Sequence, residues 1–175
     1  MDRLIVIDVQ NDFISGSLGT PEAERIVPCI RKKIESFNGE VIFTRDTHTK
    51  DYLDTKEGME LPIIHCMKGC SGWEIADELK EFVKEEPMDK PCFGNIELAK
   101  RLESENKIET IEGITLVGLC TDICIIANAF LLQAFLPETQ IIVDASCCAG
   151  VTPDSHTIAL KAMSACQIKI VGEEF

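Results

Sequence analysis

Cys124 stands where a sequence pattern typical of a buried strand changes to that of a helix. Val117-Gly118-Leu119-Cys120 runs through a glycine-containing turn directly into an apolar helical pattern. A thiol in the first turn of a helix lies near the positive end of the helix dipole, which lowers its pKa toward the reactive range. With nine cysteines in the chain, a small buried thiol is the simpler explanation of Cys124 taken alone.

Asp8 and Lys90 occupy similar places in the pattern. Asp8 ends the first apolar run, and Lys90 lies in a short segment bounded by prolines. An ionisable group beside an apolar run must be paired or lie at the carboxyl end of a strand, where open parallel sheets place their sites. Each residue alone fits a loop charge. Because all three follow strands or strand-to-helix turns, we expect Asp8, Lys90 and Cys124 to converge at one edge of a sheet.

A second group of chemically active side chains lies in the charged, irregular stretch 46–72, which holds two of the three histidines. Loops of that length are usually functional or disordered, and we expect a functional one. Asp46 and His48 are two residues apart, so on extended backbone their side chains point the same way. Carboxylate and imidazole together suit zinc, manganese or iron. Without a metal, the two residues would hydrogen-bond the loop or line a pocket.

The elements that must position these residues can be read from the pattern. Short runs rich in branched apolar residues fit strands buried on both faces of a parallel sheet. Helices are expected between them, where caps, prolines and amphipathic spacing recur. The expected strands are 4–7, 41–43, 114–117, 141–143 and 168–171, and the expected helices are 21–37, 73–84, 96–103, 122–136 and 153–165.

This alternation predicts an α/β fold: one three-layer domain over residues 1–175, with a doubly wound, mostly parallel sheet of about six strands and helices on both faces.

Composition excludes several classes of function. Seventeen basic against thirty acidic residues give a net charge of −13, which repels nucleic acid and anionic membranes. No apolar run approaches the roughly 18 residues that span a bilayer. The amino terminus lacks a secretion signal, so we expect a cytoplasmic protein with reduced cysteines. The close pairs Cys66/Cys70 and Cys120/Cys124 lack the spacing of zinc-thiolate sites.

Four motifs resemble one known family. They are Val-Ile-Asp-Val-Gln-Asn-Asp-Phe at 6–13, Thr-Arg-Asp-Thr-His at 44–48, Asp-Lys-Pro-Cys-Phe-Gly at 89–94, and Val-Gly-Leu-Cys-Thr-Asp-Ile-Cys at 117–124. In this order they resemble the isochorismatase-like cysteine hydrolases and, within them, the nicotinamidase-related amidases. The match extends over nearly the whole chain.

The resemblance implies a six-stranded sheet and a catalytic triad of Asp8, Lys90 and Cys124. It also implies a cis peptide bond at Leu119–Cys120 and an oxyanion hole formed by the amides of Cys120 and Cys124. In such a site the aspartate takes the thiol proton, the lysine stabilises the thiolate, and the thiol attacks a carbonyl carbon. Side chains that could wall the pocket, or equally pack in the core, are Phe13, Trp73, Phe93 and Leu119.

The resemblance further implies a divalent metal ion, held by an Asp-x-His pair, a third ligand and a later histidine. Here these would be Asp46, His48, Glu57 and His65, with Asp54 as a rival for the third position. The chain departs from the usual pattern because no histidine stands between His48 and His65. In metal-bearing relatives the ion holds the pyridine nitrogen of nicotinamide.

The expected function is therefore a cysteine-dependent amidase that releases ammonia from a small carboxamide, with nicotinamide as the leading candidate and no organic cofactor. One alternative is hydrolysis of another small substrate such as isochorismate, which needs no thiol. Another is a catalytically silent member that serves as a subunit or binding module. The resemblance also suggests a homo-oligomer.

Overall fold

The strands form one parallel sheet whose direction of winding reverses beside the first strand. The computed structural model describes residues 1–172. The sheet has the order β3-β2-β1-β4-β5-β6, and every adjacent pair is parallel. The strands are β1 (Arg3–Ile7), β2 (Glu40–Asp46), β3 (Met88–Lys90), β4 (Gly113–Leu119), β5 (Gln140–Ala149) and β6 (Lys169–Val171). The direction of winding reverses between β1 and β4, which is where open α/β sheets bind ligands.

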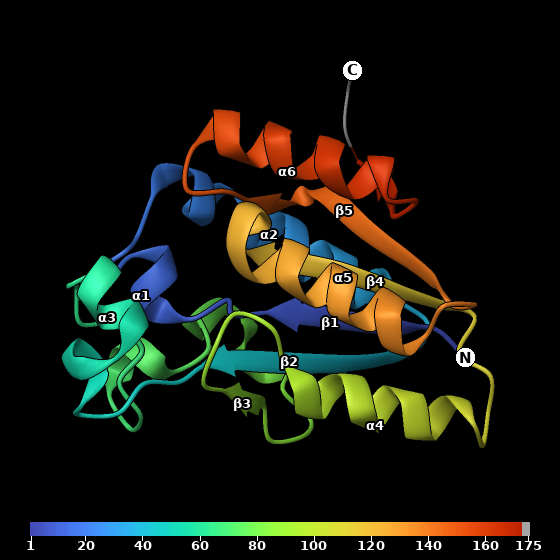
Figure 1. Ribbon diagram of the computed structural model, residues 1–175, viewed down its shortest axis with the longest axis horizontal. Helices are drawn as coiled ribbons and strands as arrows, with labels where there is room; N and C mark the ends of the chain where they lie inside the picture. Colours follow the sequence, from blue (N-terminus) through green and yellow to red (C-terminus); the bar gives the residue numbers. More distant parts are fainter. Residues whose placement is uncertain (173–175) are drawn as a thin grey trace.

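Helices cover both faces of this sheet, as predicted (Figure 1). Helices α4, α5 and α6 pack on one face, and α2 with the 3-10 turn Asp77–Phe82 packs on the other. Short helices α1 and α3 lie beyond the carboxyl ends of the strands. The helices are α1 (Asn11–Ile14), α2 (Pro21–Ser36), α3 (Lys56–Glu60), α4 (Ile96–Asn106), α5 (Ile126–Phe135) and α6 (Pro153–Ala165).

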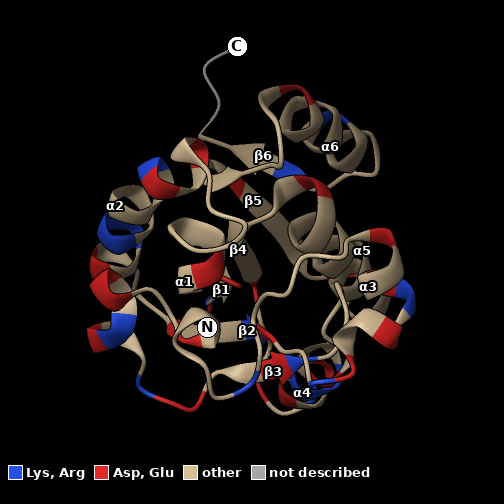
Figure 2. Cartoon of the chain, turned by 90° about the vertical axis from the view of Figure 1, so that its left-hand side faces the viewer, with Lys and Arg blue, Asp and Glu red and all other residues tan. Residues whose placement is uncertain are grey.

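β1 shows why its sequence is a continuous apolar run. Leu4 and Val6 belong to the core beneath α2, whereas Ile5 and Ile7 belong to the core beneath α4 and α5. All four side chains are fully buried. Alternate residues of a strand point to opposite faces, so residues 4–7, which are covered on both faces, are all apolar. Arg3 at the start of the strand is buried through its ion pairs with Glu40 and Glu105. Figure 2 looks onto the carboxyl ends of the strands, with α2 on one side of the sheet and α5 on the other.

The prediction of a helix over residues 73–84 is wrong. Residues 73–84 form no continuous helix but the 3-10 turns Ser71–Trp73 and Asp77–Phe82, with an extended segment between them. Asn11 N donates to Glu74 O at 3.0 Å, and Ala76 N donates to Val9 O at 2.9 Å. These bonds pair the segment with the chain that leaves β1, so its backbone groups are not free for a helix. None of the helices within residues 1–172 is long and apolar enough to cross a membrane.

We predict that Gly118→Ala in β4 will destabilise the fold far more than Gly69→Ala. Both glycines have positive φ, of 120° and 83° respectively. A Cβ at Gly118 would overlap the carbonyl oxygen of Ile7 in the adjacent strand, whereas a Cβ at Gly69 would meet open space. At either position, placing a side chain on backbone with positive φ costs about 1–2 kcal/mol. At Gly118 the steric overlap adds about 1–3 kcal/mol. Urea unfolding measures the difference, and equal losses in the two variants would contradict this packing.

Candidate active site and metal-binding group

A buried lysine ammonium joins the three residues of the expected triad. Lys90 Nζ lies 2.7 Å from Asp8 Oδ2 and 3.4 Å from Cys124 Sγ. It also lies 3.2 Å from Asp46 Oδ1 and donates to Cys92 O at 3.1 Å. The side chains of Lys90 and Asp8 are completely buried. The structure therefore brings Asp8, Lys90 and Cys124 together, as the sequence predicts.

The strand order explains this meeting. Asp8 follows β1, Lys90 ends β3, and Asp46 ends β2 and is paired in register with Lys90. Cys124 lies in the π-helical turn Thr121–Ile125, between β4 and α5. All four residues therefore lie at the carboxyl edge of the sheet, and Asp8 and Cys124 flank the reversal between β1 and β4.

The π-helical turn departs from the regular helix start that the sequence suggests. Cys120 O accepts hydrogen bonds from Ile123 N at 3.1 Å and from Ile125 N at 3.0 Å. The second bond encloses one residue more than an α-helical turn, and such turns recur at functional sites. The Leu119–Cys120 peptide bond that precedes the turn is cis, as the family resemblance implies.

Burial dominates the protonation of the triad. It raises the pKa of the Asp8 carboxyl above its ordinary value, and Lys90 opposes that rise. Burial alone would lower the pKa of Lys90, but Asp8, Cys124 and Asp46 together raise it. Burial and then Asp8 raise the pKa of the Cys124 thiol well above its ordinary value. The expectation that the helix start lowers this pKa is wrong, because the thiol is desolvated and faces a carboxylate.

Asp8 is fixed from both its backbone and its side chain. Its φ is 52°, a left-handed conformation that residues with a side chain rarely adopt. Thr44 Oγ1 donates to Asp8 Oδ1 at 2.7 Å, and the backbone N–H of Asp8 donates to Thr44 Oγ1 at 3.3 Å. Strained backbone at a buried carboxylate is a mark of functional sites.

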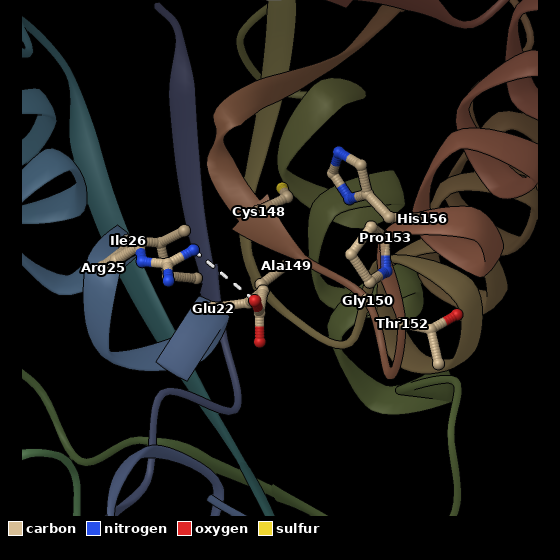
Figure 3. A pocket seen from close by; sticks show the side chains of 9 residues that line it. All are labelled: Glu22, Arg25, Ile26, Cys148, Ala149, Gly150, Thr152, Pro153 and His156. Atoms are coloured by element: carbon tan, nitrogen blue, oxygen red, sulfur yellow. Dashed lines mark hydrogen bonds and ion pairs between the residues drawn. The ribbon is translucent and has the colours of Figure 1, made fainter. Parts of the chain in front are cut away.

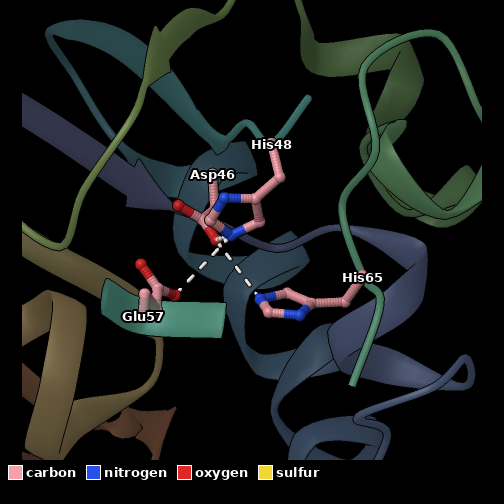
Figure 4. Close-up of side chains that lie close together, drawn as sticks. All are labelled: Asp46, His48, Glu57 and His65. Atoms are coloured by element: carbon pink, nitrogen blue, oxygen red, sulfur yellow. Dashed lines mark ion pairs between the residues drawn. The ribbon is translucent and has the colours of Figure 1, made fainter. Parts of the chain in front are cut away.

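The four expected metal ligands converge in one group (Figure 4). This group adjoins the expected triad, because Asp46 also contacts Lys90. One ligand atom from each of Asp46, His48, Glu57 and His65 lies within 4.8 Å of the others. Asp46 Oδ2 is 2.9 Å from His48 Nε2 and 3.6 Å from His65 Nε2, and His48 Nε2 is 3.6 Å from Glu57 Oε1. The rival Asp54 is exposed and is not part of this group.

The donor set fits a divalent cation. His48 Nε2 is buried and has no hydrogen bond of good geometry, although Asp46 is close. His65 Nδ1 is 2.7 Å from Ile63 O, an arrangement that leaves Nε2 free to bind a metal. Burial alone would raise the pKa of Asp46, but His48, His65 and Lys90 lower it below its ordinary value. A buried carboxylate among imidazoles matches zinc, manganese or iron chemistry.

The four expected pocket residues have different surroundings. Phe13 stacks obliquely against His65, with 5.6 Å between ring centroids. Phe93 is 44% exposed, whereas Leu119 is 2% exposed and belongs to the core on the α2 face. Trp73 is buried beneath Arg45, whose guanidinium carbon Cζ lies 3.7 Å from the centroid of the indole ring. The indole N–H of Trp73 donates to Thr47 Oγ1.

Sequence reasoning missed three buried polar residues at this edge: Thr44, Gln10 and Asn128. Gln10 Nε2 donates to Asp46 O at 2.9 Å, and Gln10 Oε1 accepts from Asp46 N at 2.7 Å, so this side chain holds the backbone of Asp46. The sequence signal that could have found these three residues is a polar side chain within a segment of otherwise apolar, buried residues.

A separate cavity of about 230 Å³ lies between the first turns of α2 and α6 (Figure 3). The buried thiol of Cys148 and the side chains of Arg25 and His156 are among the groups that line it. Arg25 is paired with Glu22 at 3.4 Å. None of the expected site residues belongs to this cavity, so it is distinct from the group around Lys90.

Several known proteins are similar to this chain in sequence and in overall structure. Over 98% of the chain and 93% of the relative, the chain is 27% identical to a nicotinamidase of Schizosaccharomyces pombe. The structure of a pyrazinamidase of Pyrococcus horikoshii in complex with zinc matches with a TM-score of 0.81 at 25% identity, over 98% of this chain and 99% of that one. A nicotinamidase/pyrazinamidase of Bacillus subtilis matches with a TM-score of 0.79 at 28% identity, over 98% and 100%. Residues 3–174 match the Isochorismatase domain, and the chain therefore belongs to the isochorismatase family.

Proposed function

We propose that this protein is a cysteine-dependent amidohydrolase that releases ammonia from a small carboxamide, with nicotinamide as the leading candidate. The observation that carries the proposal is the position of Lys90 Nζ, 2.7 Å from Asp8 and 3.4 Å from Cys124. A nucleophile beside a base and a fixed positive charge is the arrangement that acyl transfer through a thiol requires. The nicotinamidase and pyrazinamidase relatives support a carboxamide substrate.

In the first half of the reaction, Asp8 accepts the proton of the Cys124 thiol as sulfur attacks the carbonyl carbon. The carbonyl π electrons move to oxygen, and a tetrahedral oxyanion forms. The raised pKa of Asp8 suits it to this exchange, because a weakly basic carboxylate would not hold the proton. When the carbonyl re-forms, the C–N bond breaks and ammonia leaves with the proton from Asp8. The product is a thioester on Cys124.

In the second half, Asp8 takes a proton from a water molecule as the water oxygen attacks the thioester carbon. Collapse of this second intermediate breaks the C–S bond and releases the carboxylic acid, and the proton returns to sulfur. Lys90 keeps its charge throughout, because neighbouring acidic groups raise its pKa. We assign the oxyanion to the backbone amides of Cys120 and Cys124, and one such donor typically contributes about 3 kcal/mol.

The metal-binding group would position the substrate. Asp46, His48, Glu57 and His65 would hold one divalent ion, which when bound supplies a Lewis-acidic anchor for a ring nitrogen. Phe13, beside His65, is placed to contact an aromatic ring held there. The P. horikoshii pyrazinamidase was solved in complex with zinc, which supports this use of the group.

We predict that Cys124→Ala will abolish ammonia release from nicotinamide, with kcat lower by at least about a thousandfold, because no nucleophile remains. Cys148→Ala is the matched control, because Cys148 is 4% exposed in the same core where Cys124 is 5% exposed. The control should lose some stability and keep its kcat. A coupled ammonia assay measures both variants.

Unchanged ammonia release by Cys124→Ala would refute the thiol mechanism. Hydrolysis of isochorismate by the wild type and by Cys124→Ala alike would favour an isochorismatase-type reaction, which needs no nucleophilic sulfur. A wild-type protein that releases no ammonia from a panel of small amides would instead support a silent subunit or binding module.

We predict that Glu57→Gln will weaken binding of zinc by about 10–100-fold, the loss typical of a removed ligand or its support. Asp54→Asn is the matched control, since Asp54 lies three residues away and outside the group. Metal content after dialysis against a graded chelator measures this loss directly. Equal zinc retention by wild type and Glu57→Gln would remove Glu57 from the ligand set, and selective loss in Asp54→Asn would reverse the assignment.

A further inference from the structure

Helix α5 is the most apolar helix of the chain, yet it carries a fully buried amide. Asn128 is 0% exposed and lies one turn beyond Cys124, among Ile126, Ala129 and Leu132. Asparagine is a poorer helix former than alanine, and its amide must be hydrogen-bonded when it is buried. A polar residue at such a position therefore has a specific task.

The amide of Asn128 connects two segments of the proposed active site. Nδ2 donates to Cys124 O at 2.7 Å and to Phe93 O at 2.9 Å. Oδ1 accepts from the backbone N–H of Asn95 at 2.8 Å. Both amide hydrogens are used, and one side chain thus joins the turn that carries the thiol to the segment that follows Lys90.

The same segment is also held from the lysine side. Lys90 Nζ donates to Cys92 O at 3.1 Å, one residue before the carbonyl that Asn128 binds at Phe93. The ammonium and the Asn128 amide therefore hold neighbouring carbonyl groups of one short loop. Loss of the two bonds from Asn128 would therefore release the loop from the turn that carries Cys124.

We propose that Asn128 is a positioning residue that sets the separation between the Lys90 ammonium and the Cys124 thiol. This inference rests on the proposed function. It adds to the site a residue that belongs to neither the triad, the oxyanion hole nor the metal group. Asn128 acts through Cys124 and does not touch substrate. Its two donors are essential, because both of its links to carbonyl oxygens depend on them.

The kinetic test compares Asn128→Leu, which is of similar size and makes no hydrogen bond, with Asn128→Ser, which is smaller and cannot reach both carbonyls. Misplacing a nucleophile by about 1 Å lowers rates by up to about a hundredfold. We expect kcat for nicotinamide to fall about 10–100-fold, with KM within about threefold of wild type. Gln133→Leu is the control, because it removes another amide of α5, which donates to Cys166 O at 2.8 Å. Its kcat should not change.

A second readout does not depend on activity. In a crystal structure of either Asn128 variant, we expect the separation of Lys90 Nζ and Cys124 Sγ to exceed the 3.4 Å found here, whereas Gln133→Leu should preserve it. Thermal unfolding identifies a variant that is not folded, in which case the other variant decides. An unchanged separation or an unchanged kcat in a folded variant would overturn the proposal. If the wild type hydrolyses no amide, the proposed function fails, and the separation alone still tests the role of Asn128.

Discussion

The buried ammonium of Lys90 is the interaction on which the rest of the site depends. A charge removed from water is tolerated only when opposite charges and hydrogen-bond acceptors surround it. Here Asp8, Asp46, Cys124 and the carbonyl of Cys92 surround Nζ. These groups come from the ends of β1, β2 and β3 and from the turn after β4. The need to satisfy one charge therefore fixes how four segments meet at the edge of the sheet.

Asp46 extends this constraint to the neighbouring group. Its Oδ1 faces Lys90, and its Oδ2 faces His48 and His65. One carboxylate is thus shared by the proposed triad and the candidate metal-binding group, and the side chain of Gln10 holds the backbone of Asp46. Groups that share a partner do not contribute independently, so substitutions in the two groups should be non-additive. The raised pKa of the Cys124 thiol follows from the same burial, and in the proposed mechanism it requires a base such as Asp8.

Much of this arrangement could be predicted from the sequence, because buried parallel strands are continuous apolar runs and polar residues at their ends are conspicuous. The positions of Asp8 and Cys124 at this edge and the Asp46–His48 pair could be predicted in this way, and the family resemblance added the cis peptide bond and the other two members of the metal group, Glu57 and His65. β3 was missed because Met88–Lys90 is three residues long and has no apolar periodicity. The helix expected over 73–84 failed because pairing of Glu74 and Ala76 with the chain after β1 overrides local propensity. Asn128 and Gln10 were missed since their roles depend on contacts between distant segments.

The most direct test of this account is a double-mutant cycle on Lys90→Met and Asp8→Asn, with the free energy of unfolding as the measured quantity. Lys90→Met alone leaves two buried carboxylates without their counter-ion and should destabilise the fold by about 3–5 kcal/mol. Adding Asp8→Asn removes one of these charges, so the double variant should be more stable than Lys90→Met by at least about 1 kcal/mol. Additive losses, or a Lys90→Met protein as stable as wild type, would contradict the claim that this ammonium organises the site.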